Sequence, residues 1–251
     1  MTKSPNRIDK LLIDIILHLE PDCLNEPEKF TTDTKNLDMK KLQKYSDLVW
    51  SIQCAFDKTQ RYPVYFAEFY TSSKQIPDYE ALEHHIHAYL SDITILKNKV
   101  EVFLGCFKND VGKIVSNKEH FLNELQGIIK EVLKSFDNVK EHRDPHYHKG
   151  LPYIDGDLLE AKNATSILDN DNPLNKFLSD EGKKSFREKA EKSFKKAKNY
   201  RIQQAQKNNE QILGLMDVLF RGLEKGIYAF LGIKNNQENY LKPLNDVSNP
   251  L

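Results

Sequence analysis

The stretch Asp78–Phe107, which reads DYEALEHHIHAYLSDITILKNKVEVFLGCF, is the clearest helical segment of the chain. Its large apolar side chains recur at steps of three and four residues, which is the periodicity of one face of an α-helix. The stripe consists of Leu82, Ile86, Tyr89, Ile93, Leu96, Val100, Phe103 and Phe107. A continuous stripe of this length predicts a buried helix at the centre of an all-α fold.

The segments on either side carry the same periodicity. Residues 8–19 and Asp38–Phe56 are each predicted to be helical, and Asn117 is a suitable N-cap for a further helix. A short turn with glycine and asparagine joins that helix to the preceding one, so the two are predicted to be antiparallel neighbours. The stripe of the further helix is predicted to contain Phe121, Leu125, Ile128, Val132, Phe136 and Val139.

Other segments leave alternatives open. Residues 62–70 alternate like a strand, but a short helix after Pro63 fits as well. Residues 150–180 predict an irregular connection with one short helix near Leu158–Leu168. Residues 181–231 contain no proline and fit one long helix with a polar waist at Gln203–Gln211, or two helices that meet there.

The architecture predicted from these elements is an all-α, antiparallel helical bundle. Residues 1–75 are expected to form an N-terminal helical extension, and residues 76–233 a helical domain with one long C-terminal helix. Residues 234–251 are expected to be a polar tail.

The composition of the 251-residue chain is typical of a soluble globular protein. Charged residues make up 29% and apolar residues 39%, and the formal net charge is zero. No apolar run is long enough to span a bilayer, because Asp14 and His18 interrupt the longest apolar stretch near the N-terminus. The three cysteines are far apart in sequence and form no CxxC pair, which predicts a reducing cytoplasmic location without disulfides or a zinc–thiolate site.

Charge is unevenly distributed along the chain. Residues 155–181 contain seven acidic and two basic residues, a balance of −5, whereas residues 183–201 contain nine basic and two acidic residues, a balance of +7. The basic segment fits a surface for a nucleic-acid backbone. It also fits a solvated helix face that the acidic segment partly neutralises, and this second interpretation is favoured.

The six residues Arg143-Asp144-Pro145-His146-Tyr147-His148 carry the most chemistry of any segment. Continuing the stripe of the preceding helix leads to Arg143, and Pro145 prevents the helix from continuing. A guanidinium binds phosphate bidentately, and an imidazole transfers protons near neutral pH. This combination is sufficient to cleave a phosphodiester without a metal ion. The alternative is structural: Arg143 bonds the last helix carbonyls, Asp144 caps the next turn, and the histidines are polar surface.

This segment resembles the signature of the HEPN superfamily, in which an arginine, a polar residue and a histidine follow one another at short spacing. Four residues separate Arg143 from His148, and Asp144 is the polar residue after the arginine. Two helices that precede the motif and helices that follow it are also similar to the HEPN arrangement. The resemblance covers roughly residues 78–231, and Pro145 departs from the continuous helix that is more usual in the family.

The resemblance implies an all-α homodimer that acts on RNA as a metal-independent ribonuclease of toxin–antitoxin or other defence systems. Arg143 would hold the scissile phosphate, His148 would act as general acid or base, and Asp144 would orient one of them. His146, His142 and Lys149 would add substrate contacts. The resemblance implies RNA as substrate, a neutralising antitoxin as partner, and catalysis without a metal ion. No cofactor and no membrane are expected.

Two other functions remain open from the residues. One is a metal-dependent phosphoesterase in which His146 and His148 bind the ion. The other is a non-catalytic helical module that binds RNA or protein. A further polar edge, formed by His85, Tyr89 and Asp92, lies beside the stripe of Asp78–Phe107. It would reach the motif if the two helices pack together, but a satisfied helix surface is the favoured explanation.

Overall fold

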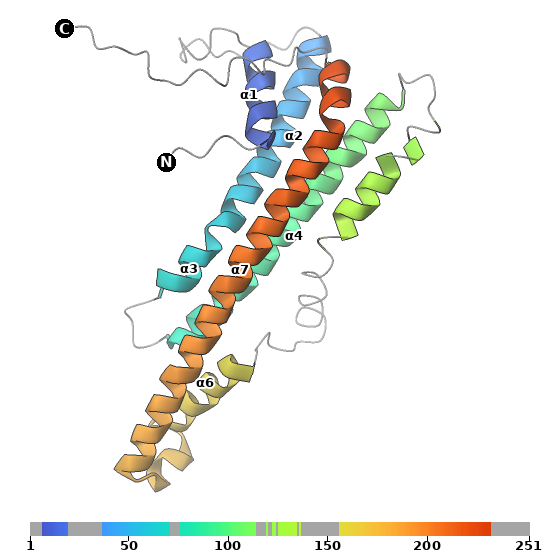
Figure 1. Cartoon of the computed structure of the whole chain (residues 1–251). Helices are drawn as coiled ribbons and strands as arrows, with labels where there is room; N and C mark the ends of the chain where they lie inside the picture. The colour runs from blue at the N-terminus through green and yellow to red at the C-terminus, as the bar shows by residue number, and fades with distance from the viewer. Residues whose placement is uncertain are drawn as a thin grey trace, which may run out of the picture. The chain divides into compact units, whose positions relative to one another are not determined.

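The computed structural model describes residues 7–19, 37–70, 76–113 and 156–231, together with residues 119, 122–123, 125–134 and 136. All regular structure within these residues is helical, which confirms the all-α prediction (Figure 1). Residues 125–134 are helical as well. The named elements are α1 (Arg7–Leu19), α2 (Leu37–Gln60), α3 (Tyr62–Glu68), α4 (Asp78–Val111), α6 (Gly156–Ile167), the 3₁₀ helix η2 (Pro173–Phe177) and α7 (Asp180–Leu231).

The chain forms two compact units that interleave along the sequence. Unit 1 contains Met1–Gln53, Val102–Gln126 and Leu215–Leu251, and unit 2 contains Cys54–Glu101 and Gly127–Gly214. Helices α2, α4 and α7 therefore contribute residues to both units. The predicted division into residues 1–75, 76–233 and 234–251 stays a prediction.

The core of unit 1 combines one apolar face of α1 with a cluster of aromatic rings. Four apolar residues of α1 are buried, in agreement with the predicted helix over residues 8–19. The ring of Tyr45 lies edge-on to that of Phe230, with centroids 5.3 Å apart, and Phe103 packs against Phe220 at 5.6 Å. Such ring pairs add about 0.5–1.5 kcal/mol each beyond the burial of their surface.

The predicted stripe of α4 is confirmed, because all eight of its apolar residues are buried. The chain then turns back at Gly112, where an added Cβ would lie 2.8 Å from the Lys108 carbonyl oxygen and 3.2 Å from the Leu122 side chain. Lys108 Nζ donates to Gln126 Oε1 at 2.6 Å. These contacts place Leu122 and Gln126 beside the end of α4, as the predicted antiparallel arrangement requires.

One member of the next predicted stripe is wrong. Leu125, Val132 and Phe136 are buried, but Ile128 is 37% exposed and Ile129 takes the buried position instead. Steps of four and three from Leu125 reach Val132 equally well through residue 128 or 129. Because both positions are isoleucine, the apolar spacing could not decide which of the two is buried, and tertiary packing decided it.

The break between α2 and α3 follows from Pro63. In a continuous helix the Thr59 carbonyl would accept a bond from the amide of residue 63, and proline has no N–H to give. The side-chain amide of Asn209, on α7, donates to this carbonyl at 3.1 Å. Residues 62–68 form a helix, so the helical alternative for residues 62–70 is correct and the strand is wrong.

Residues 180–231 form one helix rather than two. Its polar waist has a buried side, where Ala205 is fully buried and Asn209 is 6% exposed. The predicted short helix near Leu158–Leu168 is confirmed as α6, which lies beside the first part of α7 (Figure 1). Leu158, Ala161 and Ala164 are the buried residues of α6.

Candidate functional site

The predicted catalytic segment falls outside the described residues. Arg143, Asp144 and His148 lie there, as do the predicted substrate-contact residues His146, His142 and Lys149. The roles assigned to them stay predictions, and so does the metal-dependent alternative at His146 and His148. Across the residues that the structure does describe, no group of three or more His, Cys, Asp or Glu gathers in a way that would hold a metal ion.

The polar edge of α4 holds α3 in place within unit 2. The Tyr62 hydroxyl donates to Asp92 Oδ2 at 2.7 Å, and His85 Nε2 lies 2.6 Å from the backbone oxygen of Phe69. The ring of Tyr89 packs against that of Tyr62, with centroids 5.0 Å apart. These contacts account for the edge structurally, which is the explanation favoured from the sequence.

Neither buried tyrosine of this edge is suited to acid–base chemistry near neutral pH. Burial raises the pKa of Tyr89 to about 12, and the neighbouring Asn208 side chain acts in the opposite direction. Burial, followed by the hydrogen bond to Asp92, also raises the pKa of Tyr62. Both hydroxyls therefore remain protonated over the physiological range, because their charged forms are disfavoured.

A partly exposed row of side chains runs along α3. Arg61, Tyr65 and Phe69 follow one another at steps of four residues, which places them on one side of the helix. The rings of Tyr65 and Phe69 meet at 5.0 Å, and His85 from α4 stacks on Tyr65 at 6.4 Å with an interplanar angle of 29°. Phe69 is 57% exposed. The row was not singled out from the sequence, although the aromatic character of residues 62–70 was a signal for it.

Beside α3, two residues of α7 pack on Tyr70. The ring of Phe194 lies edge-on to that of Tyr70 at 5.5 Å, and the Lys198 ammonium lies 5.1 Å from the centre of the Tyr70 ring. Lys198 also donates to the backbone oxygen of Ala67 at 3.0 Å. These contacts tie the end of α3 to α7 and bring a cation next to the aromatic row.

The basic part of α7 is partly neutralised by α6. Lys189 pairs with Glu160 at 2.9 Å, and Lys196 lies 3.7 Å from Asp157. Glu160 also accepts from Ser193, and this bond, ahead of Lys189, lowers the pKa of its carboxyl group. The structure thus supports the favoured interpretation, a helix face opposed by the acidic segment. Four exposed cations of this part of α7 have no such partner in α6, namely Lys184, Arg187, Lys192 and Lys195.

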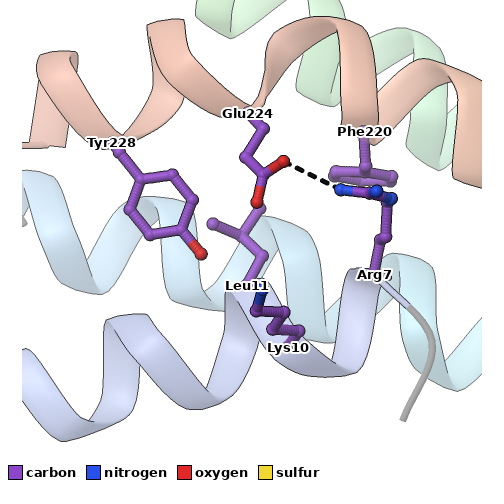
Figure 2. A pocket seen from close by; sticks show the side chains of 6 residues that line it. All are labelled: Arg7, Lys10, Leu11, Phe220, Glu224 and Tyr228. Carbon is purple, nitrogen blue, oxygen red and sulfur yellow. Dashed lines mark hydrogen bonds and ion pairs between the residues drawn. The ribbon is translucent and has the colours of Figure 1, made fainter. Parts of the chain in front are cut away.

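Unit 1 contains a small pocket between α1 and α7. Figure 2 shows Arg7, Lys10 and Leu11 of α1 facing Phe220, Glu224 and Tyr228 of α7. Arg7 pairs through Nη1 with Glu224 at 2.8 Å and through Nε with Asp217 at 2.9 Å. The guanidinium is thus committed to two carboxylates, so the pocket is better suited to fastening α1 than to binding an anion.

Asp14 adds a buried contact between α1 and α7. It is 1% exposed and accepts a hydrogen bond from the Tyr228 hydroxyl. The sequence showed Asp14 only as an interruption of the apolar run in α1. A carboxylate on the apolar face of a helix is a signal for a buried polar contact, because such a group is rarely buried without a partner.

Comparisons with protein-family models, with curated proteins and with solved structures find no match for this chain. No helix within the described ranges combines the length and the apolar character needed to cross a bilayer.

Proposed function

We propose that the chain is a HEPN-like protein that cleaves RNA without a metal ion, using Arg143 and His148. The observation that carries this proposal is the segment Arg143–His148, in which a guanidinium, a carboxylate and two imidazoles occupy six residues. These groups are the ones that phosphate binding and proton transfer require.

The order of the described helices supports the proposal. Helix α4 and the helical residues 125–134 precede the segment, and α6 and α7 follow it. This is the order that the HEPN resemblance implies. The aromatic row with its neighbouring cations, on α3 and α7, is a second supporting feature, because RNA is a polyanion with stacking bases.

The proposed reaction is attack of a ribose 2′-hydroxyl on the adjacent phosphorus. A bond forms between the 2′ oxygen and phosphorus, and the bond from phosphorus to the 5′ oxygen breaks. His148 transfers a proton to or from the reacting oxygens, and Arg143 stabilises the charge on the phosphoryl oxygens. Asp144 orients one of these side chains, while His146, His142 and Lys149 contact the substrate. DNA lacks the attacking hydroxyl and is therefore spared.

Cleavage of a mixed RNA pool by purified protein in excess EDTA tests the proposal. Wild-type protein should cleave RNA, and Arg143→Ala and His148→Ala should each lose about a hundredfold or more of the rate. His84→Ala is a matched control, because His84 is an exposed histidine outside the motif and its removal should leave the rate unchanged.

Activity that disappears in EDTA and returns with added zinc or manganese would replace the proposal with the metal-dependent phosphoesterase. RNA binding without cleavage in any condition would favour a non-catalytic module. Cleavage that survives in both motif variants would exclude the assigned site.

The pH dependence of cleavage tests the role of the histidines separately. If one imidazole must be neutral and another charged, the rate should follow a bell-shaped profile with its maximum between the two pKa values. A flat profile from about pH 5 to pH 9 would contradict histidine acid–base catalysis.

A homodimer belongs to the proposal because the resemblance implies that two motifs meet across an interface. Sedimentation equilibrium of the wild-type chain should give twice the mass of the 29.2 kDa monomer.

A role in defence, with a neutralising antitoxin, is part of the same proposal. Growth arrest on expression of the wild type, but not of Arg143→Ala, would support it.

A further inference from the structure

We propose that the row Arg61–Tyr65–Phe69, with His85 stacked beside it, is a binding platform for the bases of single-stranded RNA. We call it the α3 platform. The proposal rests on the proposed function for the identity of the ligand, and it adds a binding surface outside the motif.

The geometry of the row leaves one ring available for a ligand. Phe69 ends the row at the C-cap of α3 and is 57% exposed, whereas Phe66, three residues earlier, is buried in the core. Tyr65 is half-buried and bridges the exposed ring to His85. An exposed phenyl ring costs free energy in water unless a partner covers it, and a nucleobase is a flat partner that fits a ring face.

The platform is held in position from three sides. The Phe69 backbone oxygen is bonded to His85 on α4, and the Ala67 backbone oxygen accepts from Lys198 on α7. The Phe69 amide donates to the Tyr65 carbonyl at 3.2 Å. The backbone of Phe69 is therefore held in place, and only the side-chain torsions of its ring remain to be ordered when a base stacks there.

The charges near the platform favour a polyanion over an apolar partner. Lys58 and Arg61 are exposed at the start of the row, and Lys198 lies over Tyr70 at its end. Two exposed carboxylates act against them, Glu68 next to Phe69 and Asp78, whose charge helps to raise the pKa of Tyr70 after burial. Cations at both ends of an aromatic row are the arrangement by which proteins follow a single-stranded backbone while stacking its bases.

Binding of a fluorescent 2′-O-methyl RNA of about 10 nucleotides, measured by anisotropy, tests the α3 platform. This oligonucleotide lacks the attacking hydroxyl, so wild-type protein binds it without cleavage. Phe69→Ala should raise the Kd about 5- to 100-fold, as loss of one stacked base does. Arg61→Gln should weaken binding less and reduce its salt dependence by about one phosphate contact.

Trp50→Ala is the matched control, because Trp50 in unit 1 is also 57% exposed and lies outside the row. Its Kd should equal that of the wild type. Phe69→Leu keeps an apolar side chain while removing the ring, so weakened binding in this variant, with an unchanged melting temperature, attributes the loss to stacking rather than to unfolding.

The outcomes separate the two proposals. Equal affinity of wild type and Phe69→Leu for the oligonucleotide, beside RNA cleavage that depends on Arg143, would overturn the platform and leave the proposed function standing. A protein that neither binds nor cleaves RNA would overturn the proposed function, and the platform with it. Binding of a protein partner through Phe69, without RNA affinity, would overturn the platform, and the cleavage assay would then decide the proposed function.

Discussion

The two ends of α7 bury different kinds of side chain. In unit 1, residues 215–231 bury Met216, Leu219, Phe220, Leu223, Ile227, Tyr228 and Leu231. In unit 2, residues 180–214 bury mostly small or polar side chains, namely Ser193, Ala197, Arg201, Ala205, Asn209 and Ile212. A single helix thus packs large apolar side chains in one unit, and in the other unit it packs small or polar side chains against its neighbours.

The difference shows how one helix can combine apolar packing in one unit with specific polar contacts in the other. Large apolar side chains stabilise by the surface that they remove from water, about 25 cal/mol per Å². Polar contacts contribute less net free energy, but they make the packing specific. A buried polar group without a hydrogen-bond partner is costly, so each such group must lie next to its partner. We therefore expect substitutions in the unit 1 end of α7 to have the larger effects on stability.

The largest effect is expected from Phe220→Ala. Phe220 is 2% exposed and packs on Phe103, so its loss leaves a cavity and should lower the free energy of unfolding by about 3–5 kcal/mol. Phe194→Ala, at a half-buried position in unit 2, should cost clearly less. Urea denaturation measures both, and equal losses would contradict the comparison.

The next effect concerns the polar waist. Asn209→Leu should lower the free energy of unfolding by about 1–3 kcal/mol, because the buried Thr59 carbonyl loses its donor. Pro63→Ala supplies a backbone N–H that can bond this carbonyl. In a double-mutant cycle the two changes should therefore cost less together than the sum of each alone. Strict additivity would show that Asn209 does not substitute for the missing amide.

Two tyrosines of unit 2 give a matched pair. Tyr62→Phe removes a bonded hydroxyl and leaves Asp92 without this donor, so it should cost about 1–2 kcal/mol of unfolding free energy. The Tyr89 hydroxyl is buried, and the Asn208 side chain is near enough to lower its pKa, but no hydrogen bond of ordinary geometry joins the two groups. Tyr89→Phe should therefore be neutral or slightly stabilising in thermal and urea unfolding. A loss equal to that of Tyr62→Phe would mean that this hydroxyl is bonded in solution.

A smaller, pH-dependent effect is expected at Asp110 in unit 1. The hydrogen bond from Lys44, 2.7 Å long, is the largest cause that lowers the pKa of this carboxyl from its ordinary value of 3.8. A lowered folded-state pKa contributes stability above pH 3.8 that is lost as the pH falls through the folded-state value.

Asp110→Asn should therefore reduce the difference in unfolding free energy between about pH 6 and pH 3, by less than about 1 kcal/mol for this partly exposed pair. Asp47→Asn, which leaves the Lys44 contact intact, should keep the wild-type difference. An unchanged difference in Asp110→Asn would show that the contact contributes nothing to stability.

The smallest effect is expected from the ion pairs of α7 with α6. Lys189→Gln and Lys196→Gln remove exposed pairs and should each leave the urea midpoint of unfolding almost unchanged. Any change should shrink further in 0.5 M salt, because the Debye length is then only about 4 Å and exposed charges are strongly screened. A clear drop in the urea midpoint would mean that α6 is held by charge rather than by its buried residues Leu158, Ala161 and Ala164.

The sequence by itself determined the all-α class, the stripe of α4, the helices over residues 8–19 and Asp38–Phe56, the short helix α6 and a helical C-terminal half. These predictions succeeded because periodic apolar residues over several turns have few ways to be buried other than on one helix face. The sequence also supplies the chemistry of Arg143–His148, which the described residues leave as a proposal.

Tertiary structure alone decided the features that depend on residues far apart in sequence. It placed Ile129 rather than Ile128 in the core, made α7 one helix, and brought Asn209 to the carbonyl that Pro63 leaves without a donor. It also showed that His85 and Asp92 make contacts that hold α3 and the residue that follows it. Hydrogen bonds and packing between distant segments depend on where those segments lie in three dimensions. The apolar spacing within one segment does not specify which distant residues it will contact.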